Sequence, residues 1–228
     1  INNINFSPYP DYYLVQGNQF KELLSKFYPK NRIKVIGCLK HAYGPFKNKI
    51  NFIQKNKKLI LISFSANDCE YLCGFIKKII ITNDWKIIVT PHPSNNIDFI
   101  KEQLSISCKH LNYEFMSVPT TEILPKFSLI ICGYSTLAYE SAIFGVQSIR
   151  FTPYSIIPTR SGDKRILEFF DPENFNSWFL KNNKKLLLAN NSLKLKTLAE
   201  DYFYKNDNNA SNRLWNFINT EKKKLNSF

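Results

Sequence analysis

Residues 59–65 read Leu59-Ile60-Leu61-Ile62-Ser63-Phe64-Ser65, a continuous apolar run that decides the fold of this chain. Runs of this kind are typical of strands that are buried on both faces of a parallel sheet. Asn67 or Asp68, just after the run, can cap a helix that continues to about Ile80. The stretch therefore predicts a strand followed by a helix, which is the repeating unit of an α/β fold.

The same alternation of apolar strands and helices extends from this stretch in both directions. Further strands are expected at 12–15, 33–37, 85–90, 113–116, 127–132 and 147–151, the last of the sheet. Helices are expected at 18–28, from Ser94 or Asn95 to Leu104, at 120–126, and at 135–144 with Gly145 closing it. We predict an α/β fold with an open, doubly wound parallel sheet of the Rossmann type.

The chain is expected to have three parts. Residues 1–11 are polar, contain two prolines and read as a linker. Residues 12–160 form the Rossmann-like domain. Residues 161–228 read as C-terminal helices that pack on this domain, at about 163–170, 173–183, 189–204 and 210–222.

The composition is that of a globular protein with reduced cysteines. Of the 228 residues, 44% are hydrophobic and 21% are charged, which disfavours a disordered chain. The five cysteines are odd in number and contain no CxxC pair, which indicates free thiols and a cytoplasmic location. Cys69 and Cys73 lie four residues apart, but no His or Cys near them supports a metal site. No metal and no cofactor is predicted.

Neither a spanning helix nor a signal peptide is found in the sequence, because no run reaches about 18 apolar residues. The chain starts at Ile1 and not at Met, so it is expected to be a fragment of a longer protein.

The net charge of +13 leaves three interpretations open. Lysines on a solvated surface would explain it without any function. Attraction to an anionic membrane surface is the second interpretation. Nucleic acid is the third, but no nucleic-acid motif is present and the basic runs are not interleaved with aromatic residues, so no nucleic-acid partner is predicted.

The carboxyl ends of the strands are where ligands bind in such a sheet. The loop after the strand 85–90 reads Pro91-His92-Pro93, so His92 is held in a stiff loop between two prolines. An imidazole at this place can donate to a phosphate and offset charge on a leaving group. The alternative is an ordinary turn histidine.

A second candidate loop follows the strand 127–132 and reads Gly133-Tyr134-Ser135-Thr136. Gly133 allows close backbone approach to a ligand, and Ser135 is the expected N-cap of a helix whose first N–H groups can bind an anion. Glu140, about one turn further, can accept hydrogen bonds from ribose hydroxyls. The alternative is an ordinary capped helix with Glu140 on a solvated face.

These features together resemble the C-terminal domain of GT-B glycosyltransferases. Residues 12–37 resemble the strand, helix and strand that open this domain. Thr90-Pro91-His92-Pro93 resembles the His-Pro motif of bacterial sialyltransferases and related Kdo and capsule transferases. Tyr134-Ser135-Thr136 with Glu140 resembles their serine motif and the helix that follows. The CDP-glycerol glycerophosphotransferases of teichoic acid synthesis carry similar signals.

The resemblance implies a role for each motif residue. His92 would contact the nucleotide phosphate and assist the leaving group, and Pro93, Gly133 and Tyr134 would belong to the nucleotide site. Ser135 and Thr136 would hold the phosphate and Glu140 the ribose. Ser63 and Ser65 would line the cleft that faces a partner domain. The general base would come from an N-terminal GT-B domain, in the same or another chain, that these residues do not contain.

On this basis we expect a metal-independent, inverting glycosyltransferase that uses a CMP-activated sugar, a sialic acid-like nonulosonic acid or Kdo. Its acceptor would be a glycan or glycolipid of surface polysaccharide or lipooligosaccharide, at the cytoplasmic face of the plasma membrane. Two alternatives in the same fold are a CDP-glycerol-type glycerophosphotransferase and a UDP-sugar transferase. A third is a non-catalytic nucleotide-binding module. A serine hydrolase is disfavoured, because Gly-Tyr-Ser-Thr-Leu at 133–137 lacks the second glycine of a nucleophile elbow.

Overall fold

The computed structural model describes residues 10–42, 58–117, 120–152, 163–187, 193–205, 207 and 209–226. The chain divides into two compact units. The first contains Ile1–Asn48 and Glu200–Phe228, and the second contains Lys49–Ala199. Residues 12–48, which are expected to share one domain with the rest of 12–160, thus lie in the first unit with the end of the chain.

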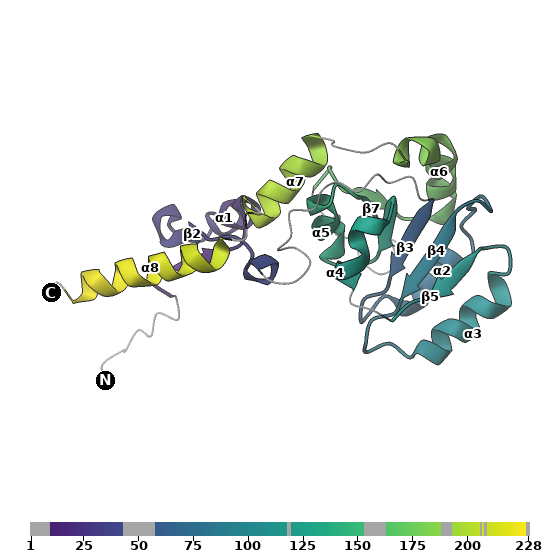
Figure 1. The fold of residues 1–228 in the computed structure, drawn as a ribbon, viewed down its shortest axis with the longest axis horizontal. Helices are drawn as coiled ribbons and strands as arrows, with labels where there is room; N and C mark the ends of the chain where they lie inside the picture. The colour runs from purple at the N-terminus through teal and green to yellow at the C-terminus, as the bar shows by residue number, and fades with distance from the viewer. Residues whose placement is uncertain are drawn as a thin grey trace. The chain divides into compact units, whose positions relative to one another are not determined.

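The first unit is built on two short parallel strands (Figure 1). β1 (Tyr13–Val15) pairs with β2 (Ile33–Val35), and α1 (Asn18–Leu24) connects them together with a 3-10 turn at Lys30–Arg32. A second 3-10 turn follows at Leu39–Ala42, and α8 (Ala210–Leu225) completes the unit. Most of the predicted linker, residues 1–9, lies outside the described residues.

The second unit contains a six-stranded sheet with the order β5-β4-β3-β6-β7-β8, in which every pair is parallel. Its strands are β3 (Leu59–Ser63), β4 (Lys86–Thr90), β5 (Tyr113–Phe115), β6 (Leu129–Cys132), β7 (Gln147–Phe151) and β8 (Leu167–Phe169). Its helices are α2 (Cys69–Ile76), α3 (Ile97–Ser107), α4 (Thr120–Ile123), a 3-10 turn at Leu124–Lys126, α5 (Leu137–Ile143) and α6 (Pro172–Leu186). α7 (Leu193–Phe203) runs across the boundary of the two units.

Both faces of the six-stranded sheet are covered, as the continuous apolar runs predict. Ile60 and Ile62 of β3 face a core to which α2, α3 and α6 contribute, with Phe75 and Phe175 among its largest buried side chains. Leu61 between them is also fully buried, on the opposite face. The predicted doubly wound parallel sheet is confirmed.

One predicted helix is wrong. Residues 163–170 were expected to be helical, but Leu167–Phe169 form β8, which pairs with β7 and extends the sheet beyond the strand at 147–151. Leu167 and Phe169 alternate with Glu168, and the Phe169 ring packs on the aromatic side chains of α6. Three residues are too few for a sequence period to separate strand from helix.

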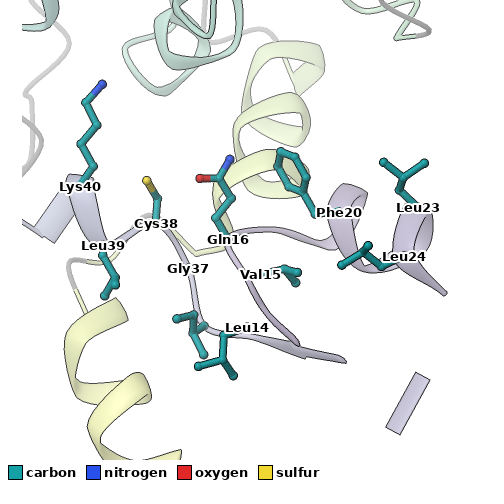
Figure 2. Close-up of a pocket in the computed structure, with 11 residues that line it drawn as sticks. Leu14, Val15, Gln16, Phe20, Leu23, Leu24, Gly37, Cys38, Leu39 and Lys40 are labelled. Atoms are coloured by element: carbon teal, nitrogen blue, oxygen red, sulfur yellow. The ribbon is translucent and has the colours of Figure 1, made fainter. Parts of the chain in front are cut away.

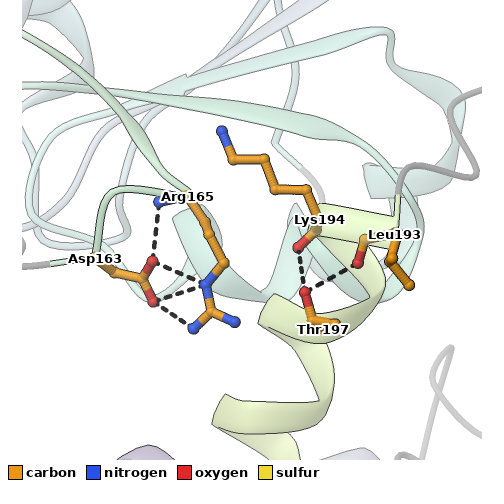
Figure 3. Close-up of polar contacts among 5 residues, drawn as sticks. All are labelled: Asp163, Arg165, Leu193, Lys194 and Thr197. Carbon is orange, nitrogen blue, oxygen red and sulfur yellow. Dashed lines mark hydrogen bonds and ion pairs between the residues drawn. The ribbon is translucent and has the colours of Figure 1, made fainter.

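An ion pair fixes the chain just before β8. The guanidinium of Arg165 contacts Asp163 with an Nη2–Oδ2 distance of 2.7 Å and an Nε–Oδ1 distance of 2.9 Å (Figure 3). These hydrogen bonds hold the pKa of Asp163 below its ordinary value. Lys194, at the start of α7, acts on Asp163 in the same direction.

Candidate functional site

The strand order places the two candidate loops around the switch point of the sheet. From β3 the chain proceeds outward to β4 and β5, and then returns to the other side of β3 with β6, β7 and β8. Ser63, at the carboxyl end of β3, lies opposite Thr90 of β4 and Cys132 of β6. Ligands of such sheets bind outside the strands at this point. The sequence-predicted site residues are therefore brought to one edge.

Asn95 fastens the loop that carries His92. Its Oδ1 accepts a hydrogen bond from the His92 N–H at 2.8 Å, and its own N–H donates to the His92 carbonyl at 2.8 Å. Its Nδ2 donates to the carbonyl of Ser65 at 3.1 Å, so the loops after β3 and β4 are joined. The helix that follows is capped by Asn96, whose side chain accepts from the Phe99 N–H, and not by Ser94 or Asn95 as expected.

The ring of His92 is exposed and is oriented by Ser94. The Ser94 N–H donates to Nδ1 of His92 at 3.2 Å, and the Ser94 hydroxyl lies 2.7 Å from the same atom. A backbone N–H can only donate, so Nδ1 acts as the acceptor and the neutral ring carries its proton on Nε2. Nε2–H has no partner among the described residues. It is the group that His92 can offer to an anion.

Asp68, expected from the sequence only as a helix cap, joins the loops that carry the candidate site residues. It stands at the N-cap of α2, but its side chain makes no capping hydrogen bond. Instead the carboxylate accepts from the N–H and from the hydroxyl of Ser65, both at 2.7 Å, and from the N–H of Gly133. Burial raises the pKa of this fully buried carboxyl, and the hydrogen bonds oppose the shift.

Gly133 is needed at the point where this carboxylate approaches the loop after β6. A Cβ at Gly133 would collide with the Asp68 carboxylate and with the Tyr71 hydroxyl. Tyr71 is also hydrogen-bonded to the backbone of Tyr134. The space that a side chain would fill at Gly133 is thus taken by Asp68 and Tyr71, and not by a ligand as expected from the sequence. The spacing of Ser65 and Asp68 after a buried strand was the available signal for this network.

Several polar groups of the serine motif, expected to bind a ligand, are hydrogen-bonded to other residues of the same loop. α5 begins at Leu137, two residues later than predicted, and the Ser135 hydroxyl accepts from the Leu137 N–H at 3.2 Å. The Ser135 N–H donates to the Gly133 carbonyl at 3.1 Å. Of the amides at 135–137 in the described loop, this leaves only the Thr136 N–H without an acceptor. The Ser135 hydroxyl can still donate its own proton.

Glu140 does not lie on a solvated face. Its side chain is 3% exposed, and its Oε1 lies 3.5 Å from the Thr136 hydroxyl. The alternative of an ordinary solvated helix is therefore wrong for this residue. Gly145 closes α5 with a positive φ of 63°, as expected.

The arrangement presents hydrogen-bond donors to a ligand at the sheet edge. His92 offers Nε2–H, Ser135 its hydroxyl and Thr136 its N–H, whereas the Thr136 hydroxyl donates to Oε1 of Glu140 at 3.5 Å. Such donors suit an anion such as a phosphate. Among the described residues, no group of three His, Cys, Asp or Glu side chains is placed to hold a metal ion.

The described residues also line clefts that include none of these donor residues. A cleft of about 550 Å³ in the first unit is lined mainly by apolar side chains of β1, α1 and the segment after β2, as Figure 2 shows. Gln16 and Lys40 are its polar members. A second cleft, of about 430 Å³, includes Lys58 and Trp85, which precede β3 and β4 and so lie at the amino ends of the strands.

Solved structures of several proteins share this fold. A variant of the wall teichoic acid polymerase TagF, soaked with CDPG, matches with a TM-score of 0.57 and 18% identity over 94% of this chain and 57% of its own. MnaA of S. aureus with UDP matches with a TM-score of 0.63 and 17% identity over 98% and 67%. The UDP-GlcNAc 2-epimerase of Neisseria meningitidis, bound to UDP-GlcNAc, gives 0.54 and 15% over 96% and 67%.

These similarities show the fold of the chain, a Rossmann-like α/β sheet of the GT-B type. No family model matches the sequence, and no curated protein does. The chain spans about three fifths of the length of the TagF structures. None of the described helices is long and apolar enough to cross a membrane.

Proposed function

We propose that this chain is the nucleotide-binding part of a GT-B transferase and that it holds the donor phosphate between His92 and the Ser135-Thr136 loop. The observation that carries the proposal is the hydrogen-bonded connection of three strand-end loops. Asn95 joins the loops after β4 and β3, and Asp68 joins those after β3 and β6. The loops are thereby held together before any ligand arrives, which is the preorganisation that anion binding requires.

We propose a cytidine nucleotide as the donor, with a CMP-activated sugar as the first candidate. The basis is the resemblance of Thr90-Pro91-His92-Pro93 and Tyr134-Ser135-Thr136 to transferases that use such donors. The acceptor would be a glycan or glycolipid at the cytoplasmic membrane face, where the net charge of +13 favours contact with anionic lipid. The acceptor site and the general base would be supplied by residues outside this chain.

A CDP-glycerol-type transferase is the second candidate, favoured by the structural similarity to TagF. UDP-bound neighbours make a UDP donor the third. These candidates differ in the base and in the number of phosphates, so binding to CMP, CDP and UDP separates them. Tighter binding of UDP than of either cytidine nucleotide would contradict the cytidine assignment.

The phosphate site is tested with His92→Ala and His92→Gln, measured by calorimetry with CMP and CDP. Loss of one hydrogen bond to a charged phosphate is expected to weaken binding about 10- to 100-fold in the alanine variant. The glutamine variant keeps an N–H donor at similar reach and should retain part of the affinity. His110→Gln, at an exposed histidine of the segment before β5, is the matched control. Unchanged binding in His92→Ala would show that the site lies elsewhere.

A further inference from the structure

Arg150 is a buried cation that has no anionic partner among the described residues. Its side chain is 5% exposed, and its Nε is enclosed by protein without an acceptor. No hydrogen bond or ion pair to this guanidinium is found among the residues that the structure describes. Such groups normally pair with a carboxylate or with carbonyl oxygens.

The guanidinium is held by two aromatic rings. Its Cζ lies 5.1 Å from the ring centre of Tyr134 and 5.4 Å from that of Tyr139. Cation–π contacts of this kind fix the position of a guanidinium. Their stabilising free energy is smaller than the free-energy cost of removing the charge from water. The rings therefore explain where Arg150 is placed and do not explain why a charge is retained there.

Arg150 lies next to the loop that carries the serine motif of the candidate site. It lies on β7 opposite Cys132, the last residue of β6, and Tyr134 belongs to the serine motif that follows. Figure 1 shows α5, which starts just after this motif, beside β7. Burial raises the pKa of Tyr71, and the positive charge of Arg150 opposes that shift. The guanidinium thus acts on the group that fastens the backbone of Tyr134.

Arg150 and His92 are placed too far apart to share one phosphate easily. β4 and β7 are separated by β3 and β6, so their carboxyl ends lie about 14 Å apart, three inter-strand spacings. Ser135 and Thr136 follow β6, between these two ends. Arg150, the Ser135-Thr136 loop and His92 thus follow one another along the carboxyl ends of the strands. Together they extend over a longer distance than a single phosphate occupies.

We propose that Arg150 binds a second anionic group of the donor, beyond the phosphate that is attached to the nucleoside. This inference rests on the proposed function and specifies its substrate class. The shared chemistry is an anionic oxygen group next to the nucleotide phosphate. Two sources fit it: the β-phosphate of a nucleoside diphosphate donor, or the carboxylate of a CMP-activated nonulosonic acid.

The test compares the wild-type chain with Arg150→Met and Arg150→Lys, using calorimetry with CMP, CDP and CMP-N-acetylneuraminic acid. Met keeps the aliphatic volume without the charge, and Lys keeps the charge without the planar fork. Arg150→Met should lose about 10- to 100-fold in affinity for the ligand with the second anionic group and much less for CMP. Arg150→Lys should fall between the two. Whether CDP or the CMP-sugar shows the loss identifies the source.

Thermal unfolding without ligand separates a binding role from a structural one. Removal of an unpaired buried charge should leave the melting temperature of Arg150→Met unchanged or raise it. A matched control is Lys101→Met on the exposed side of α3, which should change neither affinity nor stability.

Three outcomes would overturn the inference. Equal affinities of wild type and Arg150→Met for all three ligands would remove Arg150 from the site. A lower melting temperature with an equal loss for all three would make Arg150 a structural residue. If the wild type binds none of them, the proposed function fails as well.

Discussion

The carboxylate of Asp68 receives two hydrogen bonds from Ser65, one from the backbone N–H and one from the hydroxyl, both at 2.7 Å. The same carboxylate receives the N–H of Gly133, from the loop on the other side of the switch point. All three groups donate to a side chain that is fully buried. The relationship makes Asp68 a positioning residue for both loops and gives the first prediction.

Asp68→Asn should destabilise the chain and weaken nucleotide binding. An amide replaces one acceptor oxygen by a donor, which would then face another donor, so about 1–3 kcal/mol of unfolding free energy should be lost. Urea unfolding measures the stability, and calorimetry with CDP measures the binding. Asp98→Asn, at an exposed carboxylate of α3, is the control and should change stability by less than about 0.5 kcal/mol.

The difference in stability between the wild type and Asp68→Asn should also depend on pH. Burial raises the pKa of Asp68 above its ordinary value of 3.8. The stability that the protonated form contributes is therefore fully present below pH 3.8. That contribution is lost as the pH rises through the raised pKa. Asp68→Asn cannot titrate, so the stability gap between wild type and variant should be larger at pH 4 than at pH 7. A gap that widens toward pH 7 would contradict the raised pKa.

Much of this fold could be predicted from sequence because buried parallel strands are continuous apolar runs. Leu59–Ser63 and Leu129–Cys132 are examples, and both lie where they were expected. β8 could not be predicted, because three half-buried residues at the sheet edge carry too short a pattern.

The candidate site also contains residues that could be predicted from the sequence and residues that could not. His92 and the serine motif are visible because a strand end and a turn are local features of the sequence. The roles of Asp68 and Arg150 arise from neighbouring strands that are distant in sequence, and spacing does not reveal such contacts. Ser65 and Gly133 are 68 positions apart, for example, and both donate to Asp68.

Gly133→Ala gives the second prediction. The added Cβ would collide with Asp68 and Tyr71, both of which are fixed by hydrogen bonds, so the loop after β6 must shift. The expected loss of stability is about 1–3 kcal/mol, together with weaker nucleotide binding.

Gly74 offers the matched glycine control for this variant. It lies inside α2, and a Cβ there would meet no atom within 4 Å. Gly74→Ala should therefore stabilise the chain by about 0.5–1 kcal/mol, because alanine loses less conformational entropy in a helix. Urea unfolding of both variants checks the pair. Equal effects of the two substitutions would show that the contacts of Gly133 do not matter.

His41 gives the third prediction, which concerns the first unit. Its side chain is 3% exposed, and its ring lies 4.5 Å from that of Phe203. Burial lowers the pKa of His41 from 6.5 to about 4, and the charge of Lys40 adds to the effect. The neutral ring is therefore the form that the folded state accommodates.

A histidine with a lowered pKa contributes stability that is complete above pH 6.5 and is lost as the pH falls from 6.5 through about 4. The loss can reach about 3 kcal/mol, at 1.36 kcal/mol for each pKa unit. His41→Phe keeps an aromatic ring against Phe203 and cannot bind a proton, so its stability should fall less between pH 7 and pH 4. Urea unfolding at several pH values tests this, with His110→Gln as the control at an exposed histidine. Parallel pH profiles of wild type and His41→Phe would mean that His41 is protonated without cost, because solvent reaches its ring.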